Sequence, residues 1–253
     1  MSQAHTLFIA DLHLSADRPD ICNAFFHFLQ QHATQADAVY ILGDLFEAWI
    51  GDDNPEPLVD EVARALKQLS EQGVQLYFIH GNRDFILREA YAKRCGMTLL
   101  PPSKVIDLYG TPTLIMHGDS LCTLDIAYQK FRKWWDQPWW QALILAMPLW
   151  YRQHLARKAR KKSAKHKQRY VQEAQPQIMD VTPDEVPRVM AQAGVLKLIH
   201  GHTHRPAVHQ LTVDNQSAER YVLGDWYNQS SYLKVDANEW KLYFAKLDES
   251  SNR

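Results

Sequence analysis

The chain of 253 residues has few cysteines and an almost balanced charge. Its three cysteines are odd in number, have no Cys-x-x-Cys spacing and stand far apart, at Cys22, Cys95 and Cys122. This pattern argues against a disulfide framework or a zinc–thiolate site, and it indicates a reducing compartment. The 28 Lys and Arg nearly balance the 29 Asp and Glu, which gives a net charge of −1. This balance excludes nucleic-acid binding by bulk charge, so that only a local basic patch could bind nucleic acid.

The sequence also has no pattern typical of a leader segment or of a membrane-spanning run. The N-terminal residues reach Asp11 after only four apolar positions, without a basic stretch or a small-residue cleavage site, so we expect no signal peptide. The longest nearly uncharged apolar run, residues 138–151, contains two prolines and is shorter than the roughly 20 residues that span a bilayer. With 46% apolar residues, we expect a cytoplasmic protein built as a single domain, residues 1–253.

Five short apolar runs recur along the chain, and each leads into residues that can bind a metal ion. The runs have the length of buried strands and cover residues 7–10, 39–42, 76–79, 114–116 and 196–199. The candidate ligands that follow them are Asp11, His13, Asp44, Asn82, His117, His202 and His204. We therefore expect a metal centre at the ends of these strands.

The pattern between and after these runs predicts the fold. Helical patterns occupy residues 21–32 and 58–72, and short alternating β-rich runs at 220–225, 232–236 and 240–244 predict a second, largely antiparallel sheet. We expect an α/β fold of two packed sheets with helices outside. A segment from about 125 to 170, rich in Trp, Arg and Lys, predicts a helical cap or lid inserted between the fourth and fifth strands.

The candidate ligands comprise two carboxylates, four imidazoles and one amide, a set that suits two metal ions. Two divalent cations about 3.5 to 4 Å apart repel each other and need a shared anion, for which Asp44 is the candidate. Each residue alone is more often a turn, capping or core residue, and only the joint pattern favours a metal centre. Oxygen and imidazole ligands suit Mn²⁺, Fe²⁺, Co²⁺ or Zn²⁺ and leave that choice open.

Glycines and two further histidines lie beside the candidate ligands. Glycine precedes Asp44, Asn82 and His202 and follows His117, so we expect these glycines to make the sharp turns that bring the ligands inward. His80 and His200 fall on the opposite strand face and are expected to support the site without binding metal.

Several motifs together resemble the signature of the calcineurin-like metallophosphoesterases. They are Asp11-Leu-His13, Gly43-Asp44, Gly81-Asn82-Arg83-Asp84, His117-Gly-Asp119 and Gly201-His202-Thr-His204. The resemblance implies an αββα sandwich of two mixed sheets flanked by helices. More narrowly, the strings at 41–53 and 198–207 resemble the UDP-2,3-diacylglucosamine pyrophosphatase family of lipid A biosynthesis. This implies hydrolysis to 2,3-diacylglucosamine 1-phosphate and UMP by metal-activated water that attacks the α-phosphorus.

The resemblance also assigns roles to individual residues. It implies two Mn²⁺ ions, one held by Asp11, His13, Asp44 and His204 and the other by Asp44, Asn82, His117 and His202. It implies that the catalytic residues are Asp44, Asn82, Arg83 and His117. The wider superfamily commonly carries His where this chain has Arg83, which cannot act as a general acid but can neutralise phosphate charge with paired hydrogen bonds. A diphosphate substrate fits this change, because its leaving group needs less protonation than an alkoxide.

Substrate contacts implied by the resemblance extend into the cap. They map onto Asn82, Arg83, Asp125, Ser163, Lys167 and His202. At the position where family members carry a further Lys this chain has Tyr170. Lys165, Lys167 or Arg169 could supply the missing charge.

The cap is aromatic and then basic. Five of the eight tryptophans lie in residues 134–150, and nine Lys or Arg without any acid follow in residues 152–169. This composition suits an anionic membrane surface or an acyl-chain pocket, and so predicts a peripheral protein on the cytoplasmic face of the inner membrane. We expect a lipid-linked nucleotide sugar as partner, no nucleic acid and no obligate protein partner. For the cap, the alternatives are ordinary helix packing and nucleic-acid binding through basic residues and stacking Trp. For the whole chain, the alternatives are another dinuclear phosphodiesterase or nuclease and a binding module with a structural metal.

Overall fold

The first three apolar runs form parallel neighbours in a six-stranded sheet of this computed structural model, which describes residues 4–172 and 180–247. In spatial order its strands are β11 (Trp240–Lys246), β10 (Gln229–Asp236), β1 (His5–Ile9), β2 (Ala38–Leu42), β3 (Gln75–Ile79) and β4 (Met97–Leu99). The run from β1 to β4 is parallel, whereas β10 pairs antiparallel with β1 and with β11. The carboxyl ends of β1, β2 and β3 therefore meet at one edge.

The fourth and fifth apolar runs lie together in a second, five-stranded sheet. Its spatial order is β5 (Ser103–Leu108), β6 (Thr111–Met116), β7 (Lys197–His200), β9 (Gln216–Val222) and β8 (Ala207–Val213). The three central strands are parallel, and β5 and β8 pair antiparallel at the two edges. Both sheets are thus mixed.

The β-rich runs near the C-terminus do not form a sheet of their own, so that part of the prediction is wrong. The run that begins at Arg220 falls in β9 and pairs with β7, whereas the last two runs are β10 and β11 and extend the first sheet beside β1. Alternating hydrophobicity specifies which faces of a strand are buried, but it does not specify which strand becomes its neighbour.

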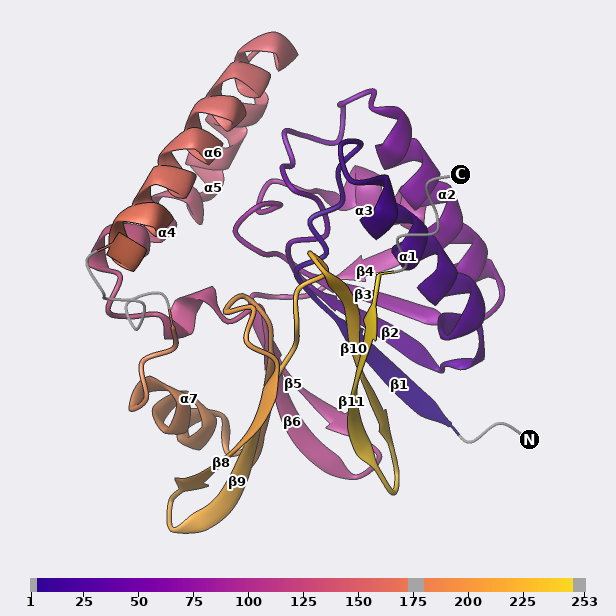
Figure 1. Ribbon diagram of the computed structural model, residues 1–253, viewed down its shortest axis with the longest axis vertical. Helices are drawn as coiled ribbons and strands as arrows, with labels where there is room; N and C mark the ends of the chain where they lie inside the picture. Colours follow the sequence, from indigo (N-terminus) through magenta and orange to yellow (C-terminus); the bar gives the residue numbers. More distant parts are fainter. Residues whose placement is uncertain (1–3, 173–179, 248–253) are drawn as a thin grey trace.

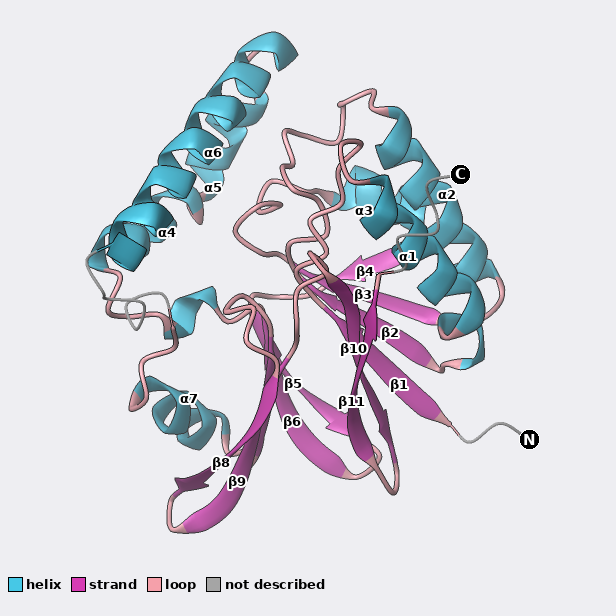
Figure 2. Ribbon diagram, in the orientation of Figure 1, coloured by secondary structure: helices cyan, strands magenta, loops and turns pink. Residues whose placement is uncertain are grey.

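Helices cover the outer face of each sheet, as Figure 2 shows. On the six-stranded sheet they are α1 (Pro19–Gln31), α2 (Pro57–Glu71) and α3 (Glu89–Cys95), and the five-stranded sheet carries α7 (Glu185–Ala193). Two short 3₁₀ turns occupy Ala33–Gln35 and Asp119–Leu121. The helical patterns at 21–32 and 58–72 are confirmed, because α1 and α2 pack the predicted apolar stripes on the sheet.

Alternate side chains of the strands build two layers of core. In β1, Leu7 and Ile9 pack with the helices, whereas Phe8 packs between the sheets with Ile115 and Ile199 of the second sheet. A third cluster lies between the second sheet and α7. The order helix, sheet, sheet, helix is the αββα sandwich that was expected.

The cap follows β6 and precedes α7 and β7. It consists of α4 (Ile126–Trp135), α5 (Pro138–Leu145) and α6 (Leu149–Gln172), and Figure 1 shows these helices as a group set apart from the two-sheet body. Within residues 4–172 and 180–247, no helix has the length and apolar character of a membrane span.

Candidate metal centre

The candidate ligands converge where strands of both sheets end. Main-chain hydrogen bonds join the loops that carry them. The amide of Asp11 donates to Gly43 O (3.1 Å), that of His13 to Asp44 O (3.0 Å) and that of Gly201 to His117 O (2.8 Å). Because parallel strands end at the same edge of a sheet, five loops far apart in sequence meet at one place.

One group of side chains consists of Asp11, His13 and His204. Nε2 of His204 lies 3.4 Å from Asp11 Oδ1 and 3.4 Å from Nε2 of His13. Their ligand atoms all fall within 4.8 Å of one another, a spacing that a single metal ion can span. Asp11 and His13 are buried, and His204 is partly exposed.

A second group surrounds His117. Its Nε2 lies 3.9 Å from Asp44 Oδ1, 3.3 Å from Asn82 Oδ1 and 3.1 Å from His202 Nδ1. The other carboxylate oxygen of Asp44 lies 3.9 Å from Nε2 of His13, in the first group. Asp44 therefore presents one oxygen to each group, the position that a bridging ligand needs.

Two buried polar atoms test whether these residues fit metal ions. Asp11 Oδ1 and His13 Nδ1 are not satisfied by a hydrogen bond in the part of the chain that the structure describes, although His204 Nε2 and Glu47 Oε2 lie 3.4 Å from them. A buried polar group without a partner costs about 1 to 3 kcal/mol, and more when it is charged, so such atoms need an explanation. A divalent cation satisfies Asp11 Oδ1 directly, and the oxygen and imidazole donors around it are suitable ligands. The site fits the metal ions that the sequence predicts.

The ligand residues themselves carry much of the backbone strain. Positive φ angles occur at Asp11 (54°), His13 (52°), Asp44 (54°), His202 (69°) and His204 (56°). Such angles cost of order 1 kcal/mol or more for a residue with a side chain, and they cluster at functional sites. The expectation that neighbouring glycines alone make these turns is therefore incomplete.

Glycine still has a clear role at two of these loops. Gly43 has a φ of 88°, and a Cβ at Gly201 would collide with the carboxylate of Asp11. At Gly201 the requirement is close approach, because its φ is not positive. The main-chain amide of His202 then reaches Asp11 Oδ2 at 2.7 Å.

In the absence of metal, burial and neighbouring charges determine the pKa values of the cluster. Burial raises the pKa of Asp44 to about 7. Burial also acts to raise the pKa of Asp11, but His204 and the neighbouring imidazoles outweigh it and hold that pKa below its usual range. Burial would lower the pKa of His117, yet Asp44 and Asp11 raise it to about 8. Bound cations would replace the protons that otherwise balance these charges.

Two carboxylates outside the candidate ligand set face the ring nitrogens that point away from it. Asp225 Oδ2 lies 3.1 Å from His204 Nδ1, and Glu47 Oε2 lies 3.4 Å from His13 Nδ1. Such partners orient imidazole ligands. Neither residue was predicted from the sequence. Leu223-Gly224-Asp225, directly after β9, repeats the Leu42-Gly43-Asp44 pattern at the end of β2, a signal that could have identified Asp225.

Arg83 and Asp84 tie the loop after β3 to the loop after β2. The Arg83 amide donates to Asp44 Oδ1 (2.8 Å), and its guanidinium lies 3.4 Å from Glu47 Oε1. Asp84 accepts hydrogen bonds from the amides of Gly81 and Leu45, each at 2.8 Å. The Arg83 side chain is a quarter exposed, so its charge lies at the rim of the ligand cluster.

His80 and His200 do not join the ligand groups. A ring nitrogen of His80 bonds to Leu87 O and one of His200 to Gly201 O, both at 2.8 Å. His200 is fully buried, and burial lowers its pKa to about 3. Each histidine thus contacts main chain, and the supporting role expected of it stays a prediction.

The cap reaches the site through its first helix. Asp119 accepts hydrogen bonds from Arg132 Nε (2.6 Å) and from the Tyr128 hydroxyl (2.8 Å), both on α4. The Tyr128 ring lies 6.0 Å from that of His202. The sequence offered no spacing that links α4 to Asp119, so these contacts were missed.

The predicted substrate contacts in the cap have different outcomes. Asp125 is buried and caps α4, where its carboxylate accepts a hydrogen bond from Tyr128 N at 3.0 Å. Substrate binding by Asp125 stays a prediction. Ser163, Lys167 and Tyr170 fall in α6, in a part whose side chains lie outside the described residues.

A cavity of about 480 Å³ lies beside the first ligand group and reaches α6. Seven of its thirteen lining residues are apolar: Leu14, Phe46, Ala48, Ile50, Pro55, Pro57 and Ala156. Glu47, which faces His13, lines the same cavity. An apolar group could therefore lie in this cavity while its polar end approaches the metal centre.

Comparison with known proteins gives a consistent result. The family described as Calcineurin-like phosphoesterase matches residues 4–206. A UDP-2,3-diacylglucosamine hydrolase of Stenotrophomonas maltophilia is 53% identical, with 94% of this chain and 97% of the relative covered. Hydrolases of the same name from Photobacterium profundum and Serratia proteamaculans are 52% and 54% identical. Those alignments cover 97% and 94% of this chain and 99% and 98% of the relatives.

Proposed function

The chain belongs to the calcineurin-like phosphoesterases, within the family of UDP-2,3-diacylglucosamine hydrolases, and we propose that it hydrolyses UDP-2,3-diacylglucosamine in lipid A biosynthesis. Water forms a new bond to the α-phosphorus, and the bond from that phosphorus to the bridging oxygen breaks. The products are UMP and 2,3-diacylglucosamine 1-phosphate. The observation that carries the proposal is the cluster of two carboxylates and four histidines, buried except for the partly exposed His202 and His204, with Arg83 at its rim.

The enzyme depends on metal, and we propose two Mn²⁺ ions. Asp11, His13, Asp44 and His204 would hold one, and Asp44, Asn82, His117 and His202 the other. When bound, divalent ions act as Lewis acids on phosphoryl oxygens and acidify water. The placement of Asp44 between the two histidine groups supports this division, since one oxygen faces His117 and the other faces His13.

Arg83 would bind the phosphoryl oxygens. Its amide holds Asp44 and its guanidinium is partly exposed at the rim, so a bound diphosphate could replace Glu47 as its partner. Arginine keeps its proton at all physiological pH values, so Arg83 can stabilise developing negative charge without supplying a proton. The leaving sugar phosphate is a weak enough base to depart without a general acid. Asn82 and His117 would contribute to the same catalytic set.

The cavity beside Glu47 and the exposed tryptophans of the cap support a lipid substrate. The cavity offers an apolar wall to an acyl chain. Trp134, Trp139 and Trp150 are more than half exposed, in a cap that is strongly basic beyond residue 151. Such a surface suits anionic lipid headgroups. We therefore infer peripheral binding to the cytoplasmic face of the inner membrane, with no nucleic acid and no obligate protein partner.

A substrate panel tests the proposal. Purified chain with Mn²⁺ is incubated with UDP-2,3-diacylglucosamine, a cyclic nucleotide and single-stranded DNA, and the products are separated. We expect UMP from the first substrate alone. Cleavage of the cyclic nucleotide or of DNA, without UMP release, would instead identify a different dinuclear phosphodiesterase. No cleavage with any metal would leave a binding module.

A further inference from the structure

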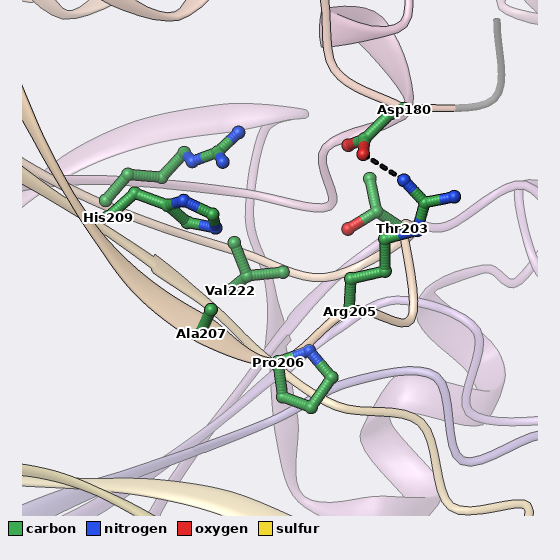
Figure 3. A pocket seen from close by; sticks show the side chains of 8 residues that line it. Asp180, Thr203, Arg205, Pro206, Ala207, His209 and Val222 are labelled. Atoms are coloured by element: carbon green, nitrogen blue, oxygen red, sulfur yellow. Dashed lines mark hydrogen bonds and ion pairs between the residues drawn. The ribbon is translucent and has the colours of Figure 1, made fainter. Parts of the chain in front are cut away.

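A second, smaller cavity of about 220 Å³ borders the loop that carries His202 and His204 (Figure 3). Thr203, the residue between these two candidate ligands, lines it. The rest of its wall comes from β8, β9, the segment that joins the ligand loop to β8, and Asp180. An occupant of this cavity would therefore touch the loop that holds two ligands of the proposed metal centre.

The cavity carries more positive than negative charge. Arg205 forms an ion pair with Asp180, the one acidic residue in the lining. Arg220 and His209 are paired across β8 and β9, so their side chains lie on the same face of the sheet. With Asp180 already engaged by Arg205, the lining holds no second carboxylate for Arg220.

The Arg220 guanidinium lacks a close partner. It is half-buried, yet it makes no hydrogen bond and no ion pair to any residue within 4–172 or 180–247. Burial lowers its pKa, and the attraction of Asp180 only partly compensates. A half-buried cation without a partner is unfavourable, so this site favours an occupant that brings oxygen acceptors or negative charge.

The two cavities differ in the chemistry of their walls. The larger one lies beside the first ligand group and combines apolar side chains with Glu47 and Glu56, whereas the smaller one lies at the His202–His204 loop and presents two arginines, a histidine and a threonine. Each cavity borders residues next to candidate metal ligands, Thr203 in the smaller one and Glu47 in the larger one. The two glutamates of the larger cavity disfavour groups rich in hydrogen-bond acceptors, whereas the two arginines of the smaller one suit a polar group with many acceptors.

We propose that the smaller cavity binds the uridine half of the substrate, with Arg220, Arg205 and Thr203 supplying hydrogen bonds to the uracil and ribose oxygens. This inference rests on the proposed function for the identity of the nucleotide. Uracil has two carbonyl acceptors and one N–H donor, and the ribose has two hydroxyls. Arginine and threonine donors match these acceptors, and His209 can donate or accept. The cavity is thus a specificity site distinct from the metal ligands.

Equilibrium binding of UMP tests this assignment without turnover. Calorimetry on the manganese-loaded full chain gives the Kd of UMP for the parent, for Arg220→Gln and for Arg205→Gln. We expect each variant to bind UMP about tenfold more weakly, because a charged hydrogen-bond donor is lost. The matched control is Arg188→Gln, an exposed arginine of α7 that pairs with Glu185 outside the cavity. It should bind UMP as the parent does.

Inorganic phosphate and uridine separate a nucleotide site from a general anion site. If Arg220→Gln weakens uridine and UMP binding but not phosphate binding, the cavity recognises the nucleoside. If it weakens phosphate binding as strongly as UMP binding, the assignment is wrong. The assignment is also wrong if both arginine variants bind UMP within twofold of the parent while thermal melting shows that they are folded. A parent that binds UMP in this way but fails to cleave UDP-2,3-diacylglucosamine would disprove the proposed function and leave the cavity assignment standing.

Discussion

The ligand loops and the cap differ in how firmly the fold holds them. The loops end strands of two sheets, and four of the seven candidate ligands are buried, with Asp11 0% and His117 1% exposed. The cap helices expose large apolar side chains, among them Trp139 at 56% and Trp150 at 68%. Metal binding and phosphoryl transfer need fixed geometry, whereas contact with a lipid surface needs exposed apolar area. The molecule provides each property in a different region.

A small number of side chains attach the cap to the body. Arg152 of α6 is buried and bonds to Ile50 O and to Asp53. The Trp135 ring lies 4.3 Å from that of Phe85. Arg88 bonds to Gln141 of α5 at 2.6 Å. Substitutions in the cap attachments and in the ligand loops should therefore have separable effects.

The largest effect is expected at the bridging position. Asp44→Asn removes the anion that faces both histidine groups, so bound metal should fall and turnover should drop by several orders of magnitude. Elemental analysis and UMP release measure the two effects, and circular dichroism checks the fold. Asp17→Asn, at an exposed carboxylate outside the candidate ligand set, is the control. Metal content and turnover close to those of the parent in Asp44→Asn would rule out a bridging role.

Arg152→Ala should affect the cap without affecting the metal centre. It removes a buried cation from Ile50 O and Asp53 and should destabilise the chain by about 1 to 3 kcal/mol. We expect faster tryptic cleavage within residues 126–161 and a higher KM, with unchanged metal content. Lys158→Ala, on an exposed position of the same helix, provides the comparison. Loss of metal in Arg152→Ala would show that the two regions are not separable.

Membrane binding should depend on the tryptophans around α5. The double change Trp139→Ser and Trp140→Ser removes aromatic area and should weaken binding to anionic vesicles several-fold. Vesicle cosedimentation measures this, and turnover of a water-soluble UDP-sugar should not change. The change Trp150→Ser tests whether the exposed tryptophan of α6 also contributes to vesicle binding. If the double variant sediments as well as the parent does, this surface is not the contact.

The smallest effect concerns the pH dependence of the cap attachment. The hydrogen bond from Arg152 lowers the pKa of Asp53 below its ordinary 3.8. Because this pKa is lowered in the folded chain, ionised Asp53 makes its full contribution to stability above pH 3.8. That contribution declines as the pH falls further. Because Asp53 is largely exposed, Asp53→Asn should cost less than about 1 kcal/mol. The difference in melting temperature from the parent should be equal at pH 5 and pH 7 and smaller at pH 3; a difference that grows on acidification would contradict this sign.

The site was more predictable than the sheets. Each candidate ligand lies within five residues of the end of a short apolar run, and parallel strands bring such positions to one edge, so the sequence pattern was enough to predict the cluster. The runs after Gly201 carried no comparable signal for their partners. β9 lies beside β7 and β10 beside β1, and both choices depend on which faces the rest of the core leaves open.

The order of residues by itself determined which side chains can bind metal, because ligand type and spacing along a strand end are local properties. Tertiary structure alone decided what surrounds them. Asp225 reaches His204, Glu47 reaches both His13 and Arg83, and Arg220 faces a cavity instead of a carboxylate. His13 and His204 are 191 positions apart, yet their Nε2 atoms are separated by 3.4 Å. Contacts over such a separation arise from the packing of two sheets, which no local pattern records.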